Sequence, residues 1–380
     1  MDVLFYFSFG LLVYSYFIFP KIMYFLGKKD QVFQGFASPS ELPTVCIVLA
    51  AYNEEAVIEK KIRSSLATTY PLDRLRILVG SDNSSDGTNA ILERLAAEFN
   101  QLSFRVFEVR TGKPQIINAL INTCESEILI LTDADTFFEP ETILELVKPF
   151  ANPKIGGVQG HLVSSGLGSA GVVAQELTYN TMELRTKLGE GRLGAVMGAH
   201  GACYAVRKSL YVPVPKGFSV DDFFVVMQVL RQNFGVVYAK NAVCSMAISG
   251  DDALQFRRKR RMATGNYQNL GYFWRMLLPH YGVRAWVFWS HKVIRWGGWV
   301  LLATLLVSGM ALMAGFGGWW GVVGVCQLLF YAGAITDYFL NYYADIEVKV
   351  LRSARHFIHM NYAMFCGFID FLRKKTSDKW

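Results

Sequence analysis

Three apolar runs in the first 135 residues each end in an acidic or polar cluster. The runs at residues 45–50, 76–80 and 127–132 lead into Ala51-Tyr52-Asn53-Glu54, Ser81-Asp82 and Asp133-Ala134-Asp135. Stretches that read as helices separate them, which predicts parallel strands in an α/β sheet. Ligands of such sheets bind in the crevice outside the carboxyl ends of the strands. We therefore expect one crevice lined by Asn53, Glu54, Asp82, Asp133 and Asp135.

The rest of the domain continues the alternation of strands and helices. Further strands are predicted at residues 104–109, 156–162, 202–206 and 235–243. Helices are predicted at 54–68, from 89, after 113, at 168–190 and at 221–233. Turn and capping residues such as Asp86-Gly87-Thr88 mark where several of these helices begin.

An apolar stretch also opens the chain. Residues 3–26 carry one charge, Lys21, and exceed the roughly 20 residues needed to cross a bilayer. No basic residue precedes the stretch and no small-residue cleavage site follows it, which argues against a cleaved signal peptide. Lys21, Lys28 and Lys29 lie at its far end, so the positive-inside rule predicts an external N-terminus and a cytoplasmic domain after the span.

A second apolar block lies near the C-terminus. Residues 296–314 and 319–340 are each long enough to span a membrane, with a glycine-rich turn at 315–318. The stretch 357–372 is shorter and has basic residues on both sides, which favours an interfacial or re-entrant segment over a span. Residues 251–295 mix basic and aromatic side chains, as helices on a membrane surface do.

These patterns divide the chain into five parts. We expect an N-terminal transmembrane helix (1–27), a cytoplasmic domain (28–250), amphipathic interfacial helices (251–295), two transmembrane helices (296–342) and an interfacial, re-entrant or transmembrane C-terminal segment (343–380). The 52% hydrophobic content agrees with membrane segments, and the net charge of +7 is modest for 380 residues. The six cysteines contain no C-x-x-C pair, so they read as core thiols in a reducing compartment.

Two acidic pairs are the main candidates for chemistry. By spacing alone, Asp133-Ala134-Asp135 is more often a helix cap or a solvated turn, but its place among converging strand ends favours a hard divalent cation holding a diphosphate. Asp221-Asp222 opens a predicted helix, where acids commonly cap the positive end. Two adjacent carboxylates exceed what capping needs, so one of them is a candidate general base.

Basic residues supply the complementary charge. Lys113 follows Thr111-Gly112, a position that suits either a surface lysine or a contact to phosphate or base. The run 257–261 is Arg-Arg-Lys-Arg-Arg. Such a run before a membrane usually contacts anionic headgroups, and it also suits stabilisation of a departing diphosphate.

In this order the motifs resemble the membrane-integrated family 2 glycosyltransferases, which include synthases of hyaluronan, cellulose and poly-N-acetylglucosamine and the ceramide glucosyltransferases. The resemblance covers roughly residues 43–270. It is carried by Ala51-Tyr52-Asn53-Glu54, Asp82 to Thr88, Gly112-Lys113, Asp133-Ala134-Asp135, Gly201 to Arg207, Asp221-Asp222 and Gln255-x-x-Arg258. It implies a GT-A-like, Rossmann-like catalytic domain flanked by transmembrane and interfacial helices.

The resemblance also implies roles for single residues. Those on the nucleotide side would be Tyr52, Asn53, Glu54, Asp82 and Lys113. Asp133 would face the ribose or the donor sugar, and Asp135, together with Asp133, would bind Mg²⁺ or Mn²⁺ on the diphosphate. Asp222 would be the catalytic base beside Asp221, Gln255 and Arg258 would lie near the leaving diphosphate, and Gly201 and Ala202 would floor the acceptor site.

One position departs from the family pattern. The basic motif of the family usually reads Q-x-x-R-W, and Lys259 stands here in place of the tryptophan that helps hold the acceptor sugar in polymerising relatives. The leading interpretation is an inverting β-glycosyltransferase that moves a sugar from a UDP-sugar to a growing exopolysaccharide at the cytoplasmic face of the cell membrane. Lys259 favours the alternative, a single glycosylation of a membrane lipid.

A third interpretation comes from another class, a sugar-nucleotide-binding regulator without turnover. Intact Asp135 and Asp222 argue against it, and too few polar residues in the spans argue against a transporter. The expected partners are a UDP-sugar, a polysaccharide or lipid acceptor and membrane lipids. Nucleic acid is not expected as a partner, and formation of a homo-oligomer stays open.

Overall fold

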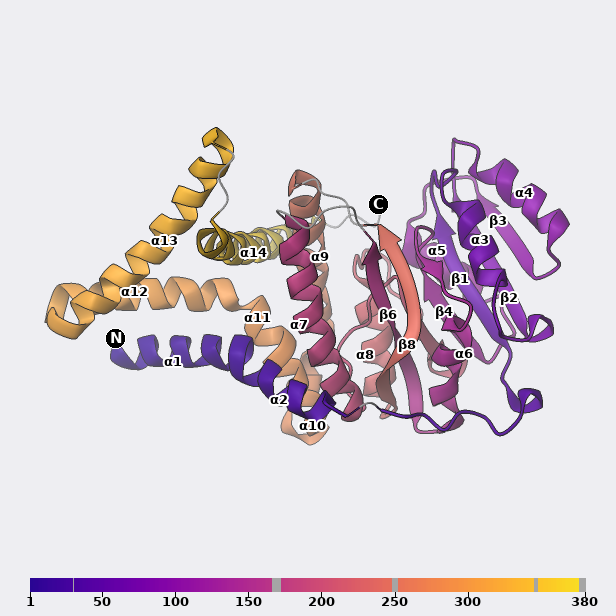
Figure 1. The fold of residues 1–380 in the computed structure, drawn as a ribbon, viewed down its shortest axis with the longest axis horizontal. Coiled ribbons are helices and arrows are strands. Elements are labelled where there is room, and N and C mark those ends of the chain that lie inside the picture. The colour runs from indigo at the N-terminus through magenta and orange to yellow at the C-terminus, as the bar shows by residue number, and fades with distance from the viewer. Residues whose placement is uncertain (30, 166–171, 248–251, 345–347, 376–380) are drawn as a thin grey trace.

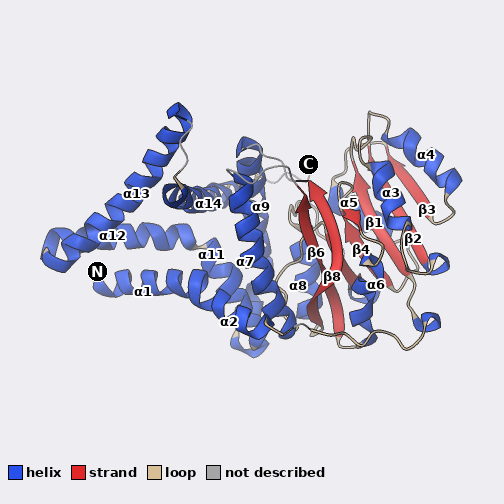
Figure 2. Ribbon diagram, in the orientation of Figure 1, coloured by secondary structure: helices blue, strands red, loops and turns tan. Residues whose placement is uncertain are grey.

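The computed structural model describes residues 1–380 apart from 30, 166–171, 248–251, 345–347 and 376–380. A mixed β-sheet lies on one side of the molecule and long apolar helices lie on the other, with α7 (Val172–Arg192) and α9 (Asp252–Phe273) between them (Figure 1). Figure 2 shows how sharply the strands are confined to the sheet side. The predicted class, an α/β domain flanked by apolar helices, is confirmed.

The sheet has eight strands in the order β3-β2-β1-β4-β7-β6-β8-β5. They are β1 (Val45–Ala51), β2 (Leu75–Asp82), β3 (Leu102–Phe107), β4 (Ile128–Thr132), β5 (Phe137–Phe138), β6 (Ile155–Ser165), β7 (Cys203–Arg207) and β8 (Gly235–Ala247). The strands β1 to β4 are parallel, whereas β7 runs antiparallel to both β4 and β6. The carboxyl ends of β1, β2 and β4 therefore share one edge.

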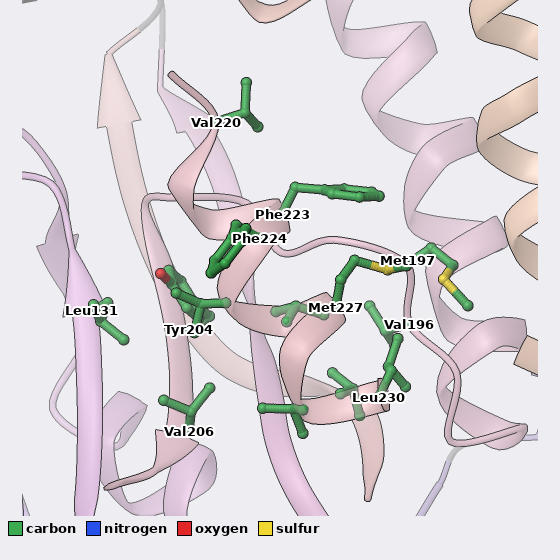
Figure 3. Packing of buried hydrophobic residues seen from close by; sticks show 14 of the residues in the cluster. Leu131, Val196, Met197, Tyr204, Val206, Val220, Phe223, Phe224, Met227 and Leu230 are labelled. Carbon is green, nitrogen blue, oxygen red and sulfur yellow. The ribbon is translucent and has the colours of Figure 1, made fainter. Parts of the chain in front are cut away.

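Helices cover both faces of this sheet. They are α3 (Ile58–Leu66), α4 (Thr88–Glu98), α5 (Lys113–Ile121), α6 (Thr142–Val147), α7 (Val172–Arg192), α8 (Asp221–Arg231) and α9 (Asp252–Phe273). All seven residues of β1 are buried, because their alternating side chains enter two hydrophobic clusters, one that includes residues of α5 and α8 and one that includes residues of α3, α4 and α6. A strand covered on both faces reads as an unbroken apolar run, as β1 does. Figure 3 shows the first of these two clusters, where Phe224 of α8 lies beside Tyr204 of β7.

One predicted helix begins later than its sequence indicates. The helix expected at 54–68 begins at Ile58, as α3. The preceding turn contains Asn53 in the left-handed region, with a φ of 54°. The amides of Glu54 and Glu55 donate to Oγ1 of Thr88 at 2.8 Å and to Oδ2 of Asp86 at 3.1 Å. These bonds tie the turn to the next strand–helix connection and delay the helix.

Three described helical segments are long and apolar enough to cross a membrane: Asp2–Gly27, Gly298–Phe316 and Gly318–Asn341. The first consists of α1 (Asp2–Val13), a π-helical turn (Tyr14–Ile18) and α2 (Phe19–Gly27). The others are α12 (Gly298–Phe316) and α13 (Gly318–Ala344), joined where Gly317 and Gly318 adopt φ values of 59° and 52°. In Figure 1, α1 and α12 run side by side away from the sheet.

A connecting region joins the sheet domain to these spans. It contains α10 (Val283–Val287), the π-helix η8 (Phe288–Val293) and α11 (Ile294–Trp296). Short 3-10 turns occur at Pro39–Glu41, Leu72–Arg74, Lys148–Ala151, Lys208–Leu210, Trp274–Leu277 and Pro279–Tyr281.

The last helix, α14 (Lys349–Leu372), is not one of the three candidate spans. Asp370 in α14 forms an ion pair with Arg260 of α9, and Arg355 pairs at 3.0 Å with the buried Asp337 of α13. The two acids that interrupt the apolar C-terminal segments therefore each have a basic partner on another helix.

Candidate active site

Three of the predicted site residues, Asp222, Asp133 and Lys113, lie around Gly201. A Cβ atom at this glycine would lie 3.3 Å from Oδ2 of Asp222 and 3.7 Å from both Oδ2 of Asp133 and Nζ of Lys113. Gly201 lies in the loop before β7, whereas Asp222 begins α8, Asp133 follows β4 and Lys113 begins α5. A side chain at position 201 would fill this space, so glycine leaves a point open between two carboxylates and an ammonium group.

Lys113 lies against Asp133, the first acid of the turn Asp133-Ala134-Asp135, which is called the D-A-D turn below. Its Nζ forms an ion pair with Oδ1 of Asp133. Burial acts to raise the pKa of the Asp133 carboxyl, but the charge and hydrogen bond of Lys113, together with the charges of His200 and Lys61, outweigh burial and hold that pKa below its usual range. Asp133 therefore stays ionised in the crevice.

Asp82 is fully buried and organises the loop that carries Lys113. Its carboxylate accepts hydrogen bonds from the amides of Thr111 at 2.6 Å and Gly112 at 3.1 Å, and from Nε of Arg110 at 3.2 Å. Gly112 adopts a φ of 89°, a conformation that favours glycine. Asp82 thus fixes the turn from which Lys113 reaches Asp133. Its predicted contact with the nucleotide stays a prediction.

Arg110 links Asp82 to a second predicted nucleotide contact. The guanidinium carbon lies 3.3 Å from the centre of the Tyr52 ring. Arginine stacks on aromatic faces while still donating to a carboxylate. Arg110 therefore joins two residues that the sequence assigned to one pocket. Arg110 belongs to none of the motifs read from the sequence, although it stands three residues before Lys113.

Asn53 and Glu54 follow β1 and have different surroundings. Oδ1 of Asn53 accepts from the amide of Ser85 at 2.9 Å, so this side chain joins the loops after β1 and β2. Burial, then the negative charges of Asp135 and Asp133, raises the pKa of Glu54 to about 7. The Glu54 carboxyl is therefore close enough to the D-A-D turn to be affected by its negative charges. The Asn53 side chain instead holds the two loops together.

Asp222 is the most strongly perturbed acid at the meeting point. Burial, then the like charge of Asp221, raises its pKa to about 7. Oδ1 accepts from the amide of Phe223 at 2.7 Å, which fixes the carboxylate at the start of α8. A carboxylate that is ionised only near neutral pH has the proton affinity that a general base requires.

The long helix α9 brings basic residues to the same region. Arg258 carries one of the positive charges that counter Asp135, and Lys259 lies close enough to His200, beside Gly201, to affect its charge. Gln255 lies in α9, but its side chain is outside the described residues. Arg258 and Lys259 therefore bring positive charge close to the crevice.

The D-A-D turn offers hard oxygen ligands, although no group of three or more His, Cys, Asp or Glu residues in the described part of the chain is arranged to hold a metal ion. Loss of hydration and the like charge of Asp133 raise the pKa of Asp135. A cation would relieve that repulsion. Mg²⁺ and similar ions are commonly held by one or two carboxylates together with substrate phosphates. The donor set at Asp133 and Asp135 fits such an ion.

A buried lysine that sequence reasoning missed stabilises the D-A-D turn through the threonines on either side of it. Lys61 of α3 is fully buried, and its Nζ donates to Oγ1 of Thr132 at 2.9 Å and to the carbonyl of Thr136 at 2.6 Å. Oγ1 of Thr132 in turn donates to the carbonyl of Ala202 at 2.7 Å, so the turn is also fixed to the predicted acceptor floor. The available signal was a lysine on the apolar face of a helix, between Ile58 and Ile62.

The chain is similar to known glycosyltransferases in sequence and in fold. The family model described as "Glycosyltransferase like family 2" matches residues 43–265. The β-monoglucosyldiacylglycerol synthase of Synechocystis is 35% identical over 127 residues, which are 33% of this chain and 26% of that protein. The poly-β-1,6-N-acetyl-D-glucosamine synthase of Staphylococcus epidermidis is 24% identical over 262 residues, 67% of this chain and 63% of that protein.

One solved structure is similar over nearly the whole chain. It is a mannosyltransferase from Pyrobaculum calidifontis, in complex with GDP-mannose and Mn²⁺, with a TM-score of 0.69 and 19% identity. The similarity covers 97% of this chain and 99% of the mannosyltransferase, so the two share a fold that includes the apolar helices. By contrast, the chain spans only about a quarter of the length of the glucosyldiacylglycerol synthases.

Proposed function

This chain belongs to the glycosyltransferase-like family 2, and we propose that it is an inverting β-glycosyltransferase that moves a sugar from a UDP-sugar to a growing exopolysaccharide. The observation that carries this proposal is the meeting of Asp222, Asp133 and Lys113 around the open point at Gly201. A direct displacement at a sugar carbon needs a base on the acceptor side and charged groups that bind the donor on the other side.

The reaction is a single displacement. Asp222 takes the proton from an acceptor hydroxyl, and the hydroxyl oxygen forms a bond to the anomeric carbon of the donor. The bond from that carbon to the UDP oxygen breaks, and UDP leaves with the electron pair. Attack from the face opposite the leaving group inverts the configuration, so an α-linked donor gives a β-glycoside.

The remaining site residues bind and orient the donor. Arg110 and Tyr52 form the wall where the nucleotide base would lie, and Lys113 with Arg258 supplies positive charge for the diphosphate. Asp133 and Asp135 would hold a divalent ion, Mg²⁺ or Mn²⁺, which when bound neutralises charge on the leaving diphosphate. The mannosyltransferase of the same fold was solved with Mn²⁺ and a nucleotide sugar, which supports a divalent ion here.

A second acceptor class has its own support. Lys259 replaces the tryptophan expected for a polymer acceptor, and the glucosyldiacylglycerol synthases, named for a lipid product, are 35–37% identical over the matched residues. The longer match to a poly-N-acetylglucosamine synthase supports the polymer. A single glycosylation of a membrane lipid is therefore the second candidate function.

The proposed location is the cytoplasmic membrane of the cell, with the catalytic domain on the cytoplasmic side. The three apolar helices support a multi-pass membrane protein. The lysines after the first span favour a cytoplasmic domain, where UDP-sugars are available.

A transfer assay tests the proposal and separates the acceptors. The full chain in nanodiscs of extracted cell lipids is incubated with Mn²⁺ and labelled UDP-glucose, UDP-N-acetylglucosamine, UDP-galactose or GDP-mannose. We expect label from one UDP-sugar in a product of high mass that a β-specific hydrolase degrades. Label in a chloroform-soluble product of one sugar would establish the lipid acceptor instead. Binding of UDP with no transfer from any donor would identify a regulator without turnover and overturn the proposal.

A further inference from the structure

A chain of buried charged residues connects the membrane-proximal π-helix η8 to α7. His291 of η8 is 1% exposed and lies between two carboxylates of α7. Its Nδ1 bonds to Oε1 of the fully buried Glu190, and its Nε2 lies 3.0 Å from Oε2 of Glu183. Each ring nitrogen therefore has a carboxylate oxygen of α7 within hydrogen-bond distance.

Two further cations complete this cluster. Lys292 lies 3.4 Å from Glu183 and 3.3 Å from Nε2 of His291, and Arg295 lies 3.9 Å from Glu183. Burial acts to raise the pKa of Glu190, but His291 and Lys187 outweigh it and hold that pKa below its usual range. Buried charges destabilise a fold unless each is paired, so these groups tolerate little displacement from one another.

The cluster reaches the active-site loop through α7. The second oxygen of Glu190 accepts the amide of Met197 at 3.1 Å, and the buried Lys187 donates to the carbonyls of Met197 and Gly198. These residues belong to the segment 196–201 that ends at Gly201. One carboxylate therefore holds His291 with one oxygen and the loop with the other.

The loop in turn packs on the helix that carries Asp222. Gly198 adopts a φ of 72°, and a Cβ atom there would lie 2.4 Å from the Phe223 ring, so the backbone rests directly on this side chain. The Phe223 ring centre lies 6.0 Å from that of Phe288 in η8 and 5.4 Å from that of Trp296. Figure 3 shows Met197 and Val196 of the loop beside Met227 and Leu230 of α8.

We propose that His291 is a positioning residue for the transfer reaction, because it sets the loop 196–201 against Asp222 through Glu190. The π-helix supports this role, since such irregular turns occur frequently at functional sites and here place His291 and Phe288 against the domain. An apolar contact would suffice to attach the domain to the membrane region. The paired charges instead fix one register between the connecting region that leads into α12 and the loop that ends at Gly201.

Two nearly isosteric substitutions separate the two bonds of His291. The side-chain amide of asparagine can occupy the place of Nδ1 and keep the bond to Glu190, whereas that of glutamine reaches the place of Nε2 and keeps the bond to Glu183. We expect His291→Gln to free the amides of 196–201 for hydrogen–deuterium exchange, about tenfold faster or more, because a buried bond to a charged group is lost. His291→Asn should keep most of the protection.

A matched control removes a different contact between the connecting region and the sheet domain. Nη1 of Arg284 in α10 donates to Oδ1 of Asn233 at 2.7 Å, another contact between the connecting region and the sheet domain. Arg284→Gln removes that contact without touching α7 or the loop, and exchange within 196–201 should match the unsubstituted chain.

The catalytic consequence is measured separately and rests on the proposed function. With the donor that the transfer assay selects, His291→Gln should lower kcat by about 10–100-fold, because a small misplacement of reacting groups has effects of that size. Binding of UDP with Mn²⁺, measured by calorimetry, should stay unchanged in both variants. Equal exchange in the Gln and Asn variants, or fast exchange with unchanged kcat, overturns the proposal. Hydrogen–deuterium exchange is measured without substrate. The exchange rates of residues 196–201 can therefore be interpreted even if the proposed transfer reaction is not observed.

Discussion

Asp222 and Asp133 approach the same point beside Gly201, with carboxylate oxygens 3.3 Å and 3.7 Å from a Cβ atom built there. The first acid lies in the first turn of α8, the second follows β4, and they are 89 positions apart in the sequence. In the proposed reaction, the acceptor hydroxyl and the donor sugar would meet between them. Their proximity also makes position 201 a sensitive probe of the site.

Enlarging Gly201 should block the reaction in proportion to the added volume. Gly201→Ala adds one carbon at a distance that requires a neighbour to shift by a few tenths of an ångström, so we expect a modest loss of turnover. Gly201→Val should lose about 100-fold or more, because the added methyl groups displace substrate from its reactive position. Steady-state kinetics with circular dichroism of each variant checks this. A fully active valine variant with native circular dichroism would show that the reacting groups meet elsewhere.

The metal assignment predicts the behaviour of Asp135→Asn. An amide cannot replace the carboxylate charge on a divalent ion shared with a diphosphate, so Mn²⁺-dependent turnover should be abolished. Binding of Mn²⁺ in the presence of UDP should weaken by at least about tenfold in calorimetry. Exposed Glu139→Gln, four residues further on, is the charge-matched control and should bind the ion normally. Near-normal rates for Asp135→Asn with Mg²⁺ or Mn²⁺ present would show that the metal assignment is wrong.

The membrane topology can be tested by thiol labelling in intact cells. Cys326 and Cys366 are first replaced by serine, because they are not buried, whereas the other four cysteines are. In this background, an impermeant reagent should label Asp2→Cys from outside. It should not label Glu93→Cys, an exposed position on α4 near Asp86, until the cells are opened. The reverse pattern would end the proposal, since the UDP-sugar donors are cytoplasmic.

Much of the site was predictable because strand ends converge by topology. Parallel strands β1, β2 and β4 bring Glu54, Asp82 and Asp133 to one edge, and that follows from the alternation of apolar runs and helices. The late start of α3 was not predictable, because it depends on bonds between Glu54 and Thr88 across two loops. His291 and Lys187 were missed for the same reason, since the partners of His291 lie on α7 and those of Lys187 in the loop at Met197 and Gly198.

The raised pKa of Asp222 predicts how activity depends on pH. A base must be ionised to accept a proton, and burial raises the pKa of this carboxyl to about 7. Turnover should therefore rise as pH increases through about 7 and level off above it. Glu54 titrates in the same range, so the rise should be assigned with Glu54→Gln, in which a single ionisation near neutral pH should remain. A flat profile between pH 5.5 and 8.5 would contradict the role of Asp222.

The adjacent acids Asp221 and Asp222 provide the sharpest test of the mechanism. General-base catalysis contributes typically about 10²–10⁴-fold, so Asp222→Asn should lose at least that much turnover. UDP binding should survive, because Lys113 and Asp135, the proposed contacts on the diphosphate side, are unchanged. The folded Asp222 has its pKa raised above that of the unfolded chain, so the fold loses stability as pH rises from about 4 to about 7, and the loss persists at higher pH. Asp222→Asn should therefore have a higher Tm than the unsubstituted chain at pH 8, which rules out misfolding as the cause of lost activity.

Asp221→Asn is the matched comparison, since the same change of charge is made one residue away. We expect a milder loss, because Asp221 acts on the reaction through its effect on the pKa of Asp222. Removing that like charge should lower the pKa of Asp222 and shift the pH profile of turnover to lower pH. If Asp221→Asn is inactive while Asp222→Asn still turns over, the base is Asp221. If both variants lose UDP binding equally, the pair belongs to the nucleotide pocket, and the base must be sought among the other acids at the crevice, beginning with Glu54, whose pKa is also about 7.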